Sequence, residues 1–267
     1  SNRGAVEVSN SGSSLNNTVE LINNEFTYNT EQPAIQILGQ EKLLIDNNLI
    51  KHNGTFMNSS LGGLYVQDVD SVYILNSRLD SNRSSYGGGA AFMRGNIKYI
   101  KVQNTRFQGN ISDEKAVASY QYEGGSGMYI STSIPADLLF NHCFFNGNYS
   151  NPNGTRTTYN GTLYVEVTGD SVWSTFNIDN CTFNKNRSHL SSAVGFKVGP
   201  PSTSSPLSSV KAHGKLIINH STFSNNTAKK GNLISAVGNS WNDNKSEIDI
   251  SNSTIYGNHS NHKLVSS

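Results

Sequence analysis

Four aromatic residues occupy matching positions in short runs of alternating residues, and they are the first candidates for binding chemistry. The runs read GGLYV, GGAAF, GSGMYI and GTLYV, and if their aliphatic residues face a core, the aromatic residues face outward on successive strands. Rings flanked by polar groups can stack on sugar rings, so the pattern predicts carbohydrate binding. Two alternatives stay open: long loops cover this face, or the rings stack only to stabilise a sheet. The candidate sugar-binding residues are Tyr65, Phe92, Tyr129, Tyr164, Arg94 and Glu166.

The carboxylates near the aromatic runs are the candidates for catalysis. Hydrolysis of a glycosidic bond needs two carboxyl groups at a suitable separation. The nearest approach to such a pair is Asp68 with Asp70, or Glu166 with Asp170, and the other acidic residues are scattered. The sequence contains no nucleophile elbow, phosphate loop or zinc signature. We therefore predict no catalytic residue, no metal and no cofactor, and an enzyme is the second choice of function.

A seven-residue motif recurs along the chain and indicates how these residues are positioned. Its consensus is Asn or His, a small polar residue, any residue, Phe, Leu or Ile, two residues of any kind, and Asn. Successive copies start 24 to 40 residues apart, as in a solenoid whose loops vary in length. The eight copies are NNEFTYN (23–29), NNLIKHN (47–53), NSRLDSN (76–82), NTRFQGN (104–110), HCFFNGN (142–148), NCTFNKN (180–186), HSTFSNN (220–226) and NSTIYGN (252–258).

Alternating runs on both sides of the motif predict three short strands in each period. Period-2 alternation without helical periodicity, and with a polar residue at a sharp bend, is typical of a parallel β-helix. Asparagine tolerates a left-handed backbone, so the first motif residue is predicted to form a stacked corner, with His142 and His220 in the same structural role. Eight to nine coils would form a rod about 40 Å long. The predicted inward ladder is Phe26, Ile50, Leu79, Phe107, Phe145, Phe183, Phe223 and Ile255.

The two cysteines of the chain hold the same slot in adjacent copies of the motif. Cys143 and Cys181 each precede the ladder phenylalanine by two residues, so both side chains are predicted to point inward. Their Cα atoms should lie one strand spacing apart, about 4.8 Å. A disulfide and a stack of two free thiols both fit this separation.

Acceptor sequences for N-linked glycans are frequent and recur at the closing Asn of the motif. We expected this Asn to leave the strand into an exposed loop, which would give a stripe of glycans along one edge. Asn180 and Asn252 are expected to stay unmodified because the corner ladder engages them. The alternative is that all acceptor sequences are accidents of composition in a bacterial cytosolic protein. The predicted sites are Asn16, Asn53, Asn58, Asn82, Asn110, Asn148, Asn153, Asn160, Asn186, Asn225, Asn244 and Asn258.

The FxxN copies, such as Phe107 to Asn110 and Phe145 to Asn148, together with GGAAF at 88–92, carry a family resemblance. They resemble the repeats in the passengers of chlamydial polymorphic outer-membrane proteins and, more broadly, the right-handed β-helices of the pectin-lyase-like superfamily. The resemblance covers nearly the whole chain and implies a right-handed single-stranded parallel β-helix. It also implies a surface-exposed structural or adhesive rod.

Composition and charge limit the classes of partner. The net charge is +1 without a long basic run, which predicts no nucleic acid and no anionic membrane surface as a partner. No apolar stretch is long enough for a membrane span, and the start lacks the pattern of a signal peptide, as in a mature or trimmed chain. We predict one all-β domain over residues 1–267, with long insertion loops near 112–124, 149–160 and 199–213.

These observations predict an extracellular or cell-surface protein with a structural or adhesive role. Neither end of the sequence carries a recognisable cap, so the chain is predicted to assemble end to end with copies of itself into a filament. The competing explanation is that the chain is a fragment of a longer rod. The other predicted partners are covalent N-linked glycans and a cell-surface or matrix polysaccharide. The alternative function is a carbohydrate-binding or polysaccharide-degrading protein, a lyase or hydrolase, that uses the aromatic face.

Overall fold

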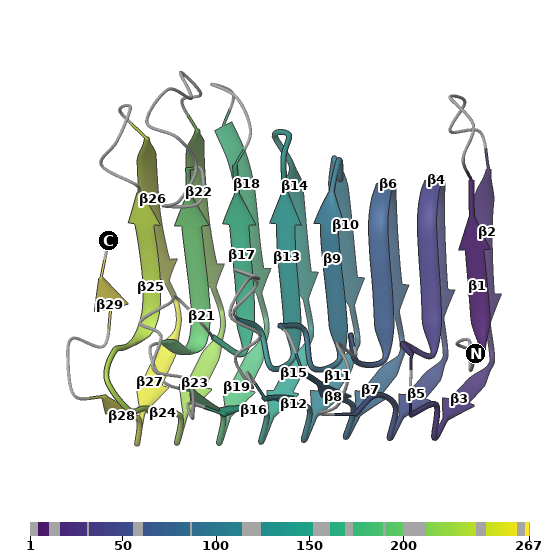
Figure 1. Ribbon diagram of the computed structural model, residues 1–267. Coiled ribbons are helices and arrows are strands. Elements are labelled where there is room, and N and C mark those ends of the chain that lie inside the picture. Colours follow the sequence, from purple (N-terminus) through teal and green to yellow (C-terminus); the bar gives the residue numbers. More distant parts are fainter. Residues whose placement is uncertain are drawn as a thin grey trace.

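The structure is a computed structural model of the 267-residue chain, and it is built from parallel β-strands. It describes residues 5–10, 17–30, 32–55, 61–85, 87–113, 124–151, 161–168, 173–188, 191–199, 212–238, 244–260 and 265–266. Within these ranges every regular element is a strand, and no helix could span a membrane. All strand pairs described are parallel, and equivalent strands of successive repeats lie side by side along one direction (Figure 1). The arrangement is solenoid-like and compatible with a parallel β-helix.

The strands form three sheets. The first sheet has 15 strands, the second has eight and the third has six. The first contains β1 (Val6–Ser9), β2 (Thr18–Ile22), β4 (Ile35–Asp46), β6 (Leu64–Leu75), β9 (Ala91–Gly95), β10 (Tyr99–Gln103), β13 (Met128–Thr132), β14 (Asp137–Asn141), β17 (Leu163–Val167), β18 (Trp173–Asp179), β21 (Ser191–Val198), β22 (His213–Asn219), β25 (Asn232–Gly238), β26 (Lys245–Ser251) and β29 (Val265–Ser266).

The second and third sheets consist of shorter strands. The second contains β3 (Glu25–Thr27), β5 (Leu49–Lys51), β7 (Arg78–Asp80), β11 (Arg106–Gln108), β15 (Phe144–Asn146), β19 (Thr182–Asn184), β23 (Thr222–Ser224) and β27 (Thr254–Tyr256). The third contains β8 (Arg83–Ser84), β12 (Ile111–Asp113), β16 (Tyr149–Asn151), β20 (Arg187–Ser188), β24 (Thr227–Ala228) and β28 (His259–Ser260). The third sheet was not predicted, because strands of two or three residues are too short to show alternation.

The predicted apolar ladder forms the centre of the second sheet. Phe107 pairs with Leu79 on one side and with Phe145 on the other, and the same register continues through all eight copies of the motif. The rings of Phe107 and Phe145 are stacked with centroids 4.7 Å apart, and those of Phe145 and Phe183 lie 4.6 Å apart. The residues at the fourth position of the motif therefore form one continuous column of packed side chains, although the copies lie 24 to 40 residues apart in the sequence.

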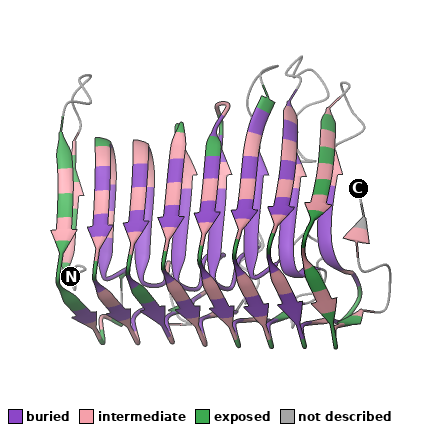
Figure 2. Ribbon diagram, turned by 180° about the vertical axis from the view of Figure 1, so that it is seen from behind, coloured by how far each residue is buried: buried purple, intermediate pink, exposed green. Residues whose placement is uncertain are grey.

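The hydrophobic core runs the length of the molecule between the three sheets. Alternate residues of the first sheet point into it, as in β22, where Leu216 and Ile218 are buried and their neighbours are not. The core is less covered on the end strands: Val19 and Leu21 near one end, and Ile248 and Ile250 near the other, are only partly buried. Figure 2 shows this contrast between the middle strands and the outermost ones.

Each repeat turns at two corners in the left-handed backbone region. The first corner is the predicted one: the first residue of all eight motif copies has φ between +46° and +59°, including His142 and His220. The second corner is the sixth motif residue, which was not predicted. Its eight members have φ between +54° and +62°, and they range from Tyr28 and Lys185 to Gly147.

A ladder of asparagines lies just inside the second corner. In the first seven copies of the motif, the backbone N–H and Nδ2 of the closing Asn donate to Oδ1 of the closing Asn in the next repeat, with Nδ2–Oδ1 distances of 2.9–3.1 Å. From the second copy on, Nδ2 also donates to the carbonyl oxygen of the preceding apolar ladder residue at 2.7–2.9 Å. This ladder satisfies polar groups that the turn buries.

The predicted insertion loops fall largely outside the described residues. Of the segments near 112–124, 149–160 and 199–213, the structure describes mainly the edges, where residues 111–113 form β12 and residues 149–151 form β16.

Candidate functional site

The predicted aromatic stripe lies on the outer face of the first sheet. Tyr65, Phe92, Tyr129 and Tyr164 are register partners on β6, β9, β13 and β17. Their neighbours Leu64 and Val66 belong to the main core, whereas the four aromatic residues form a separate hydrophobic cluster. The predicted register and the predicted side of the sheet are confirmed.

The prediction that these four aromatic side chains are exposed to solvent is wrong. The four aromatic residues are 6%, 1%, 1% and 3% exposed, in chain order, so a sugar ring has no open platform there. The rings stack on one another, with centroids 4.8 Å apart for Phe92 and Tyr129 and 5.6 Å apart for Tyr129 and Tyr164. Gly124 contributes to the cover: a Cβ at this position would lie only 2.9 Å from Cγ of Tyr164. Burial by chain packed over the outer face is the alternative that the sequence left open.

A polar row follows the aromatic stripe one step further along the strands. Arg94 on β9 donates from Nε and Nη2 to Oε1 of Gln67 on β6, at 3.0 and 2.8 Å. The hydroxyl of Tyr65 donates to the same oxygen, and the guanidinium carbon of Arg94 lies 5.6 Å from the centroid of the Tyr65 ring. Arg94 is therefore already held by hydrogen bonds and a cation–π contact within the sheet.

Glu166 and Lys197 form a buried ion pair in the same row. Nζ of Lys197 lies 2.7 Å from Oε1 of Glu166, and the Tyr129 hydroxyl donates to Oε2 at 3.2 Å. Glu166 is only 7% exposed. Both oxygens of this carboxylate are thus engaged, and the two charges compensate each other at a site where burial removes most of their contact with water.

The other acidic residues considered for catalysis are engaged as well. Asp68 accepts a hydrogen bond from the backbone N–H of Asn96 at 2.9 Å and another from Nε2 of Gln67 at 3.0 Å. Asp70 pairs with Lys98 at 2.6 Å, and Asp170 lies outside the described residues. Across the described ranges, no group of three or more His, Cys, Asp or Glu residues could hold a metal ion. Asp68, Asp70 and Glu166, the described members of the two candidate pairs, are therefore each engaged with neighbouring protein groups.

The closing asparagines were predicted to be glycan acceptors in an exposed loop, and the structure corrects their position. The five residues Asn53, Asn82, Asn110, Asn148 and Asn186 are 0% exposed, because they form the buried ladder. Each Nδ2 uses its two hydrogens on two acceptors, whereas a glycosylated Nδ2 keeps only one. The folded ladder is therefore incompatible with a glycan at these positions.

The remaining predicted acceptors differ in position. Asn225 is exposed at the second corner, with Nδ2 donating to Oδ1 of Asn184 at 3.2 Å. Asn244 and Asn258 are half-buried, and Nδ2 of Asn258 donates to the carbonyl of Phe223 at 2.8 Å. Asn225 is thus the accessible acceptor among the described predicted positions. The predicted acceptors outside the described residues are Asn16, Asn58, Asn153 and Asn160.

Cys143 and Cys181 are free, buried thiols, so of the two predicted alternatives the structure has the stacked pair. They continue a column of small polar side chains, in which the backbone N–H of Cys143 donates to Sγ of Cys181 at 3.4 Å and that of Cys181 donates to Ser221 Oγ at 3.1 Å. Burial, followed by the interaction with Cys143, raises the pKa of the Cys181 thiol well above its usual value.

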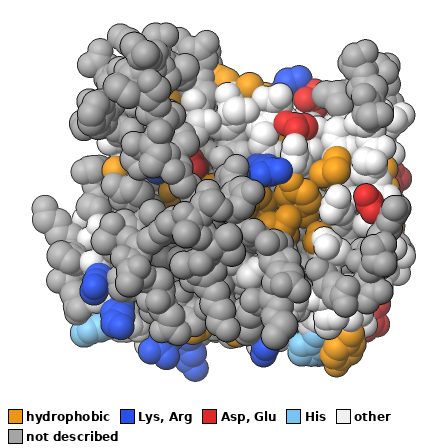
Figure 3. Space-filling view, viewed as in Figure 1, with side chains coloured by type: hydrophobic (Ala, Val, Ile, Leu, Met, Phe, Trp, Pro, Cys, Tyr) orange, Lys and Arg blue, Asp and Glu red, His pale blue; other side chains and the backbone are white. Residues whose placement is uncertain are grey.

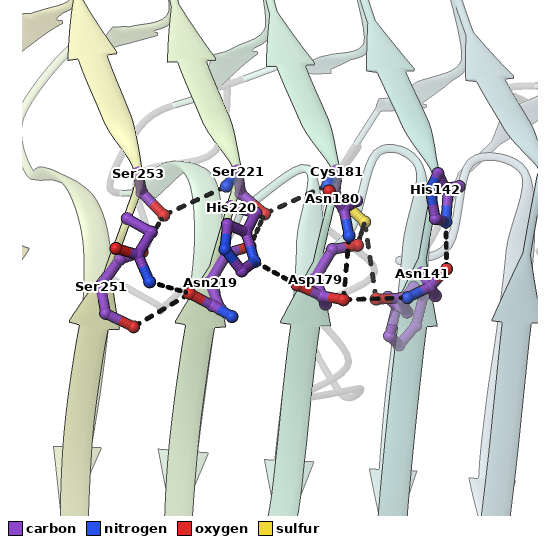
Figure 4. Close-up of polar contacts among 12 residues, drawn as sticks. Asn141, His142, Asp179, Asn180, Cys181, Asn219, His220, Ser221, Ser251 and Ser253 are labelled. Atoms are coloured by element: carbon purple, nitrogen blue, oxygen red, sulfur yellow. Dashed lines mark hydrogen bonds and ion pairs between the residues drawn. The ribbon is translucent and has the colours of Figure 1, made fainter.

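The first corner carries an exposed polar network on its outer side, drawn in Figure 4. The carboxylate of Asp179 accepts hydrogen bonds from Nδ2 of Asn141 at 3.1 Å and of Asn180 at 3.0 Å, and it lies 3.2 Å from Nδ1 of His220. His142 contacts Asn141 through Nδ1. The two histidines thus occupy asparagine slots in a stacked row, which agrees with the structural role predicted for them.

Comparisons with known proteins add no relative: no protein-family model, curated protein or solved structure matches the chain. The coarse architecture, an all-β chain of parallel sheets in a solenoid-like arrangement, stands on its strand pairing. The sequence did not lead us to predict the ion pair of Glu166 with Lys197 or the ladder of closing asparagines. In both cases the interacting residues occupy equivalent positions in neighbouring repeats, so aligning the repeats with one another could have revealed them.

Proposed function

We propose that the chain is a right-handed parallel β-helix of eight to nine coils that serves as an extracellular, glycosylated structural or adhesive rod. The observation that carries this proposal is the unbroken asparagine ladder beside the stacked apolar ladder. Together they extend through all eight strands of the second sheet, a length of about 34 Å at the usual strand spacing. Handedness and kinship to the pectin-lyase-like and chlamydial passenger repeats come from the sequence resemblance.

A structural role accounts for the engaged polar groups better than catalysis does. The carboxylates of Glu166, Asp68 and Asp70 all bind neighbouring protein groups, and the aromatic face is buried. A lectin or polysaccharide-degrading enzyme would need this face open to a polymer. The same contacts stabilise a rod, because each joins one repeat to the next.

We propose further that rods stack end to end into a filament. Val19 and Leu21 near one end, and Ile248 and Ile250 near the other, are apolar residues that neighbouring strands only partly cover. The asparagine ladder is also directional, since each Oδ1 accepts from the Asn of the preceding repeat, whereas each Nδ2 donates to Oδ1 of the following repeat and to a carbonyl oxygen of the preceding one. A second copy could continue it only head to tail, and head-to-tail contacts of this kind produce open filaments.

Extracellular location and glycosylation are supported by the exposed acceptor at Asn225 and by the low charge of the chain. The proposal predicts a glycan at Asn225 and none at the buried Asn148. Mass spectrometry of glycopeptides from native material tests this pair directly. An unmodified Asn225 together with unmodified acceptors elsewhere would remove the glycosylated part of the proposal and leave the rod.

Assembly is tested by electron microscopy of the native protein and of a variant with Ile248→Asp and Ile250→Asp. We expect fibres from the native chain and single short particles from the variant, because two carboxylates at the end face oppose stacking. Ile217→Asp on the outer face of β22 is the matched control and should still give fibres. Short particles from the native chain at high concentration would contradict the filament.

A further inference from the structure

The two cysteines of the chain are neighbours in a hydrogen-bonded column at the first corner. We call it the corner column, and it consists of the second residue of each motif copy. Within it the backbone N–H of one repeat donates to the side chain of the next, as from Asn48 to Ser77 and from Ser221 to Ser253, each at 3.1 Å. Cysteine is a weaker donor and acceptor than the residues at the other positions, so hydrogen bonding alone does not explain it there. The eight members are Asn24, Asn48, Ser77, Thr105, Cys143, Cys181, Ser221 and Ser253.

The backbone aligns the two cysteines with each other. The residues that precede them have φ of +52° and +51°, and the strands that follow them, β15 and β19, are paired in register. Equivalent Cα atoms of paired strands lie about 4.8 Å apart, within the range of roughly 4.4–6.8 Å that disulfides span. Sγ of Cys181 lies 3.4 Å from the backbone N of Cys143 and 3.6 Å from the carbonyl oxygen of Phe140. This sulfur therefore points toward the repeat that holds Cys143.

The corner does not depend on the two thiol hydrogens. The thiol of Cys181 donates to the carbonyl oxygen of Asp179 at 3.3 Å, and that of Cys143 donates to the carbonyl oxygen of Asn141 at 3.4 Å. Each of these two oxygens also accepts a backbone N–H of the preceding repeat at 3.1 Å. Thiols are weak donors, so loss of both hydrogens leaves the two oxygens with their stronger partners.

Both thiols are shielded from solvent. Cys143 is 2% exposed and Cys181 is 1% exposed. The strands that follow them run along the lower edge of the molecule, where Lys, Arg and His side chains lie on the described surface (Figure 1 and Figure 3). Burial raises the pKa of the Cys181 thiol, so the folded chain holds little of the thiolate that attacks other sulfur atoms. Exchange therefore requires the corner to open, as it is during folding, and burial then protects a closed bond from reductants.

We infer that Cys143 and Cys181 are a redox pair, which a small disulfide such as oxidised glutathione converts into an intramolecular disulfide joining the fifth and sixth repeats. In the first step, the thiolate of one cysteine attacks a glutathione sulfur and releases one glutathione thiolate, which leaves a mixed disulfide. The thiolate of the other cysteine then attacks the protein sulfur of this mixed disulfide and releases the second glutathione. The chain loses two electrons and two protons, and the oxidised glutathione gains them to become two molecules of reduced glutathione.

The bond closes a loop between two repeats that a long segment separates. Cys143 and Cys181 are 38 residues apart, whereas the first four motif copies start only 24 to 29 residues apart. A disulfide stabilises a fold largely by restricting the unfolded chain, and more so for a longer loop. The oxidised chain is thus expected to resist unfolding better than the reduced one. The inference is independent of the proposed filament and glycans, because it concerns two forms of a single chain.

Refolding of the full chain in mixtures of oxidised and reduced glutathione tests the inference. The reduced protein is unfolded in denaturant, refolded at several ratios of the two glutathiones and quenched with an alkylating reagent. Mass spectrometry then counts free thiols and identifies linked peptides, and we expect a link between Cys143 and Cys181. Denaturant unfolding of the native chain should give an equilibrium constant for unfolding about 100-fold smaller in the oxidised form than in the reduced form.

Two matched variants distinguish alignment in the corner column from chance pairing. In Cys181→Ser, Ser221→Cys the two cysteines lie two repeats apart, with about 9.6 Å between Cα atoms, which is too far for a disulfide. This variant should form no intramolecular disulfide. In Cys143→Ser, Ser221→Cys the two cysteines lie in adjacent repeats and should form one. Both variants place Ser in a column that already contains Ser, and circular dichroism confirms that they fold.

The variant Cys143→Ser, Cys181→Ser is the control for the measurement of stability, and its free energy of unfolding should not depend on the ratio of the two glutathiones. A native chain that refolds in excess oxidised glutathione without the bond between Cys143 and Cys181 would overturn the inference. An intramolecular disulfide between cysteines two repeats apart, or an oxidised chain no more stable than the reduced one, would overturn it as well.

Discussion

Nδ2 of Asn148 donates to Oδ1 of Asn186 at 3.0 Å and to the carbonyl oxygen of Phe107 at 2.9 Å, and both asparagines are fully buried. One side chain therefore connects three successive repeats. Water cannot reach these groups, so removing one Asn would leave buried donors and acceptors unpaired. The ladder therefore contributes to the stability of the fold mainly by avoiding this cost. The stability of the solenoid-like fold accordingly depends on side chains that look like ordinary polar residues in the sequence.

Asn148→Ala should destabilise the fold by about 2–4 kcal/mol, because it leaves buried acceptors on both sides without a donor. Denaturant unfolding followed by circular dichroism measures the change. The control is Asn177→Ala on the outer face of β18, which should stay within about 0.5 kcal/mol of the native chain. Equal effects at the two positions would contradict a stabilising ladder.

Phe145→Ala should cost about 3–5 kcal/mol, because Phe145 fills the core between the stacked rings of Phe107 and Phe183. The neighbouring residue Phe144 is half-buried and points to the other face of β15, so Phe144→Ala is a control with the same chemical change. Thermal and denaturant unfolding should show a much smaller loss for this control. A loss at Phe144 as large as that at Phe145 would mean that the register is wrong.

Gly147→Ala should destabilise the fold by about 1–2 kcal/mol through the backbone alone. Gly147 has φ of +61°, and an added Cβ would meet no atom within 4 Å, so no steric clash contributes. Gly147→Asn should be milder, since Asn occupies the equivalent corner position at Asn225. A lower free energy of unfolding for Gly147→Asn than for Gly147→Ala would contradict this explanation.

Glu166→Gln should cost about 3–5 kcal/mol, because it removes the carboxylate charge that lies 2.7 Å from the largely buried ammonium group of Lys197. Lys197→Met should be comparably destabilising, and the double variant should lose less than the sum of the two. A double-mutant cycle from denaturant unfolding measures this coupling. Strictly additive losses would show that the ion pair makes no net contribution.

The buried thiol of Cys181 predicts a dependence of stability on alkaline pH. Its pKa is raised in the folded chain, so the unfolded chain loses this proton first as the pH rises past the ordinary thiol value of about 8.5. The stabilisation is therefore complete below that pH and declines above it. Unfolding at pH 7 and pH 10 should show a smaller decline for Cys181→Ser than for the native chain. An identical decline in both would exclude the thiol as a source of it.

The sequence predicted those parts of the fold in which one residue type recurs at one position. The recurrence of Asn180 and its equivalents predicted the first corner, and the recurrence of Phe183 and its equivalents predicted the inner ladder. The second corner was missed because Tyr28, Gly147 and Lys185 share no chemical type, although all adopt the same backbone conformation. When the surrounding structure imposes a left-handed backbone conformation on a residue, the type of that residue does not reveal the conformation.

The candidate sites were predicted less well than the fold, for two physical reasons. Asn148 satisfies both the pattern of a glycan acceptor and that of a buried ladder, and only burial distinguishes them. Tyr129 was placed correctly on the outer face, but its exposure depends on residues distant in the sequence, such as Gly87, where an added Cβ would lie 3.2 Å from Cδ2 of the Tyr129 ring. Alternation along a strand gives the side of a sheet and says nothing about what packs on that side.

Cryo-electron microscopy of the native material would show both the stacking of repeats and the contact between copies. We expect fibres in which strands about 4.8 Å apart continue across the boundary between subunits, with the line of buried asparagines running along the fibre axis. Isolated particles, or fibres whose strands run along the axis instead of across it, would contradict this expectation.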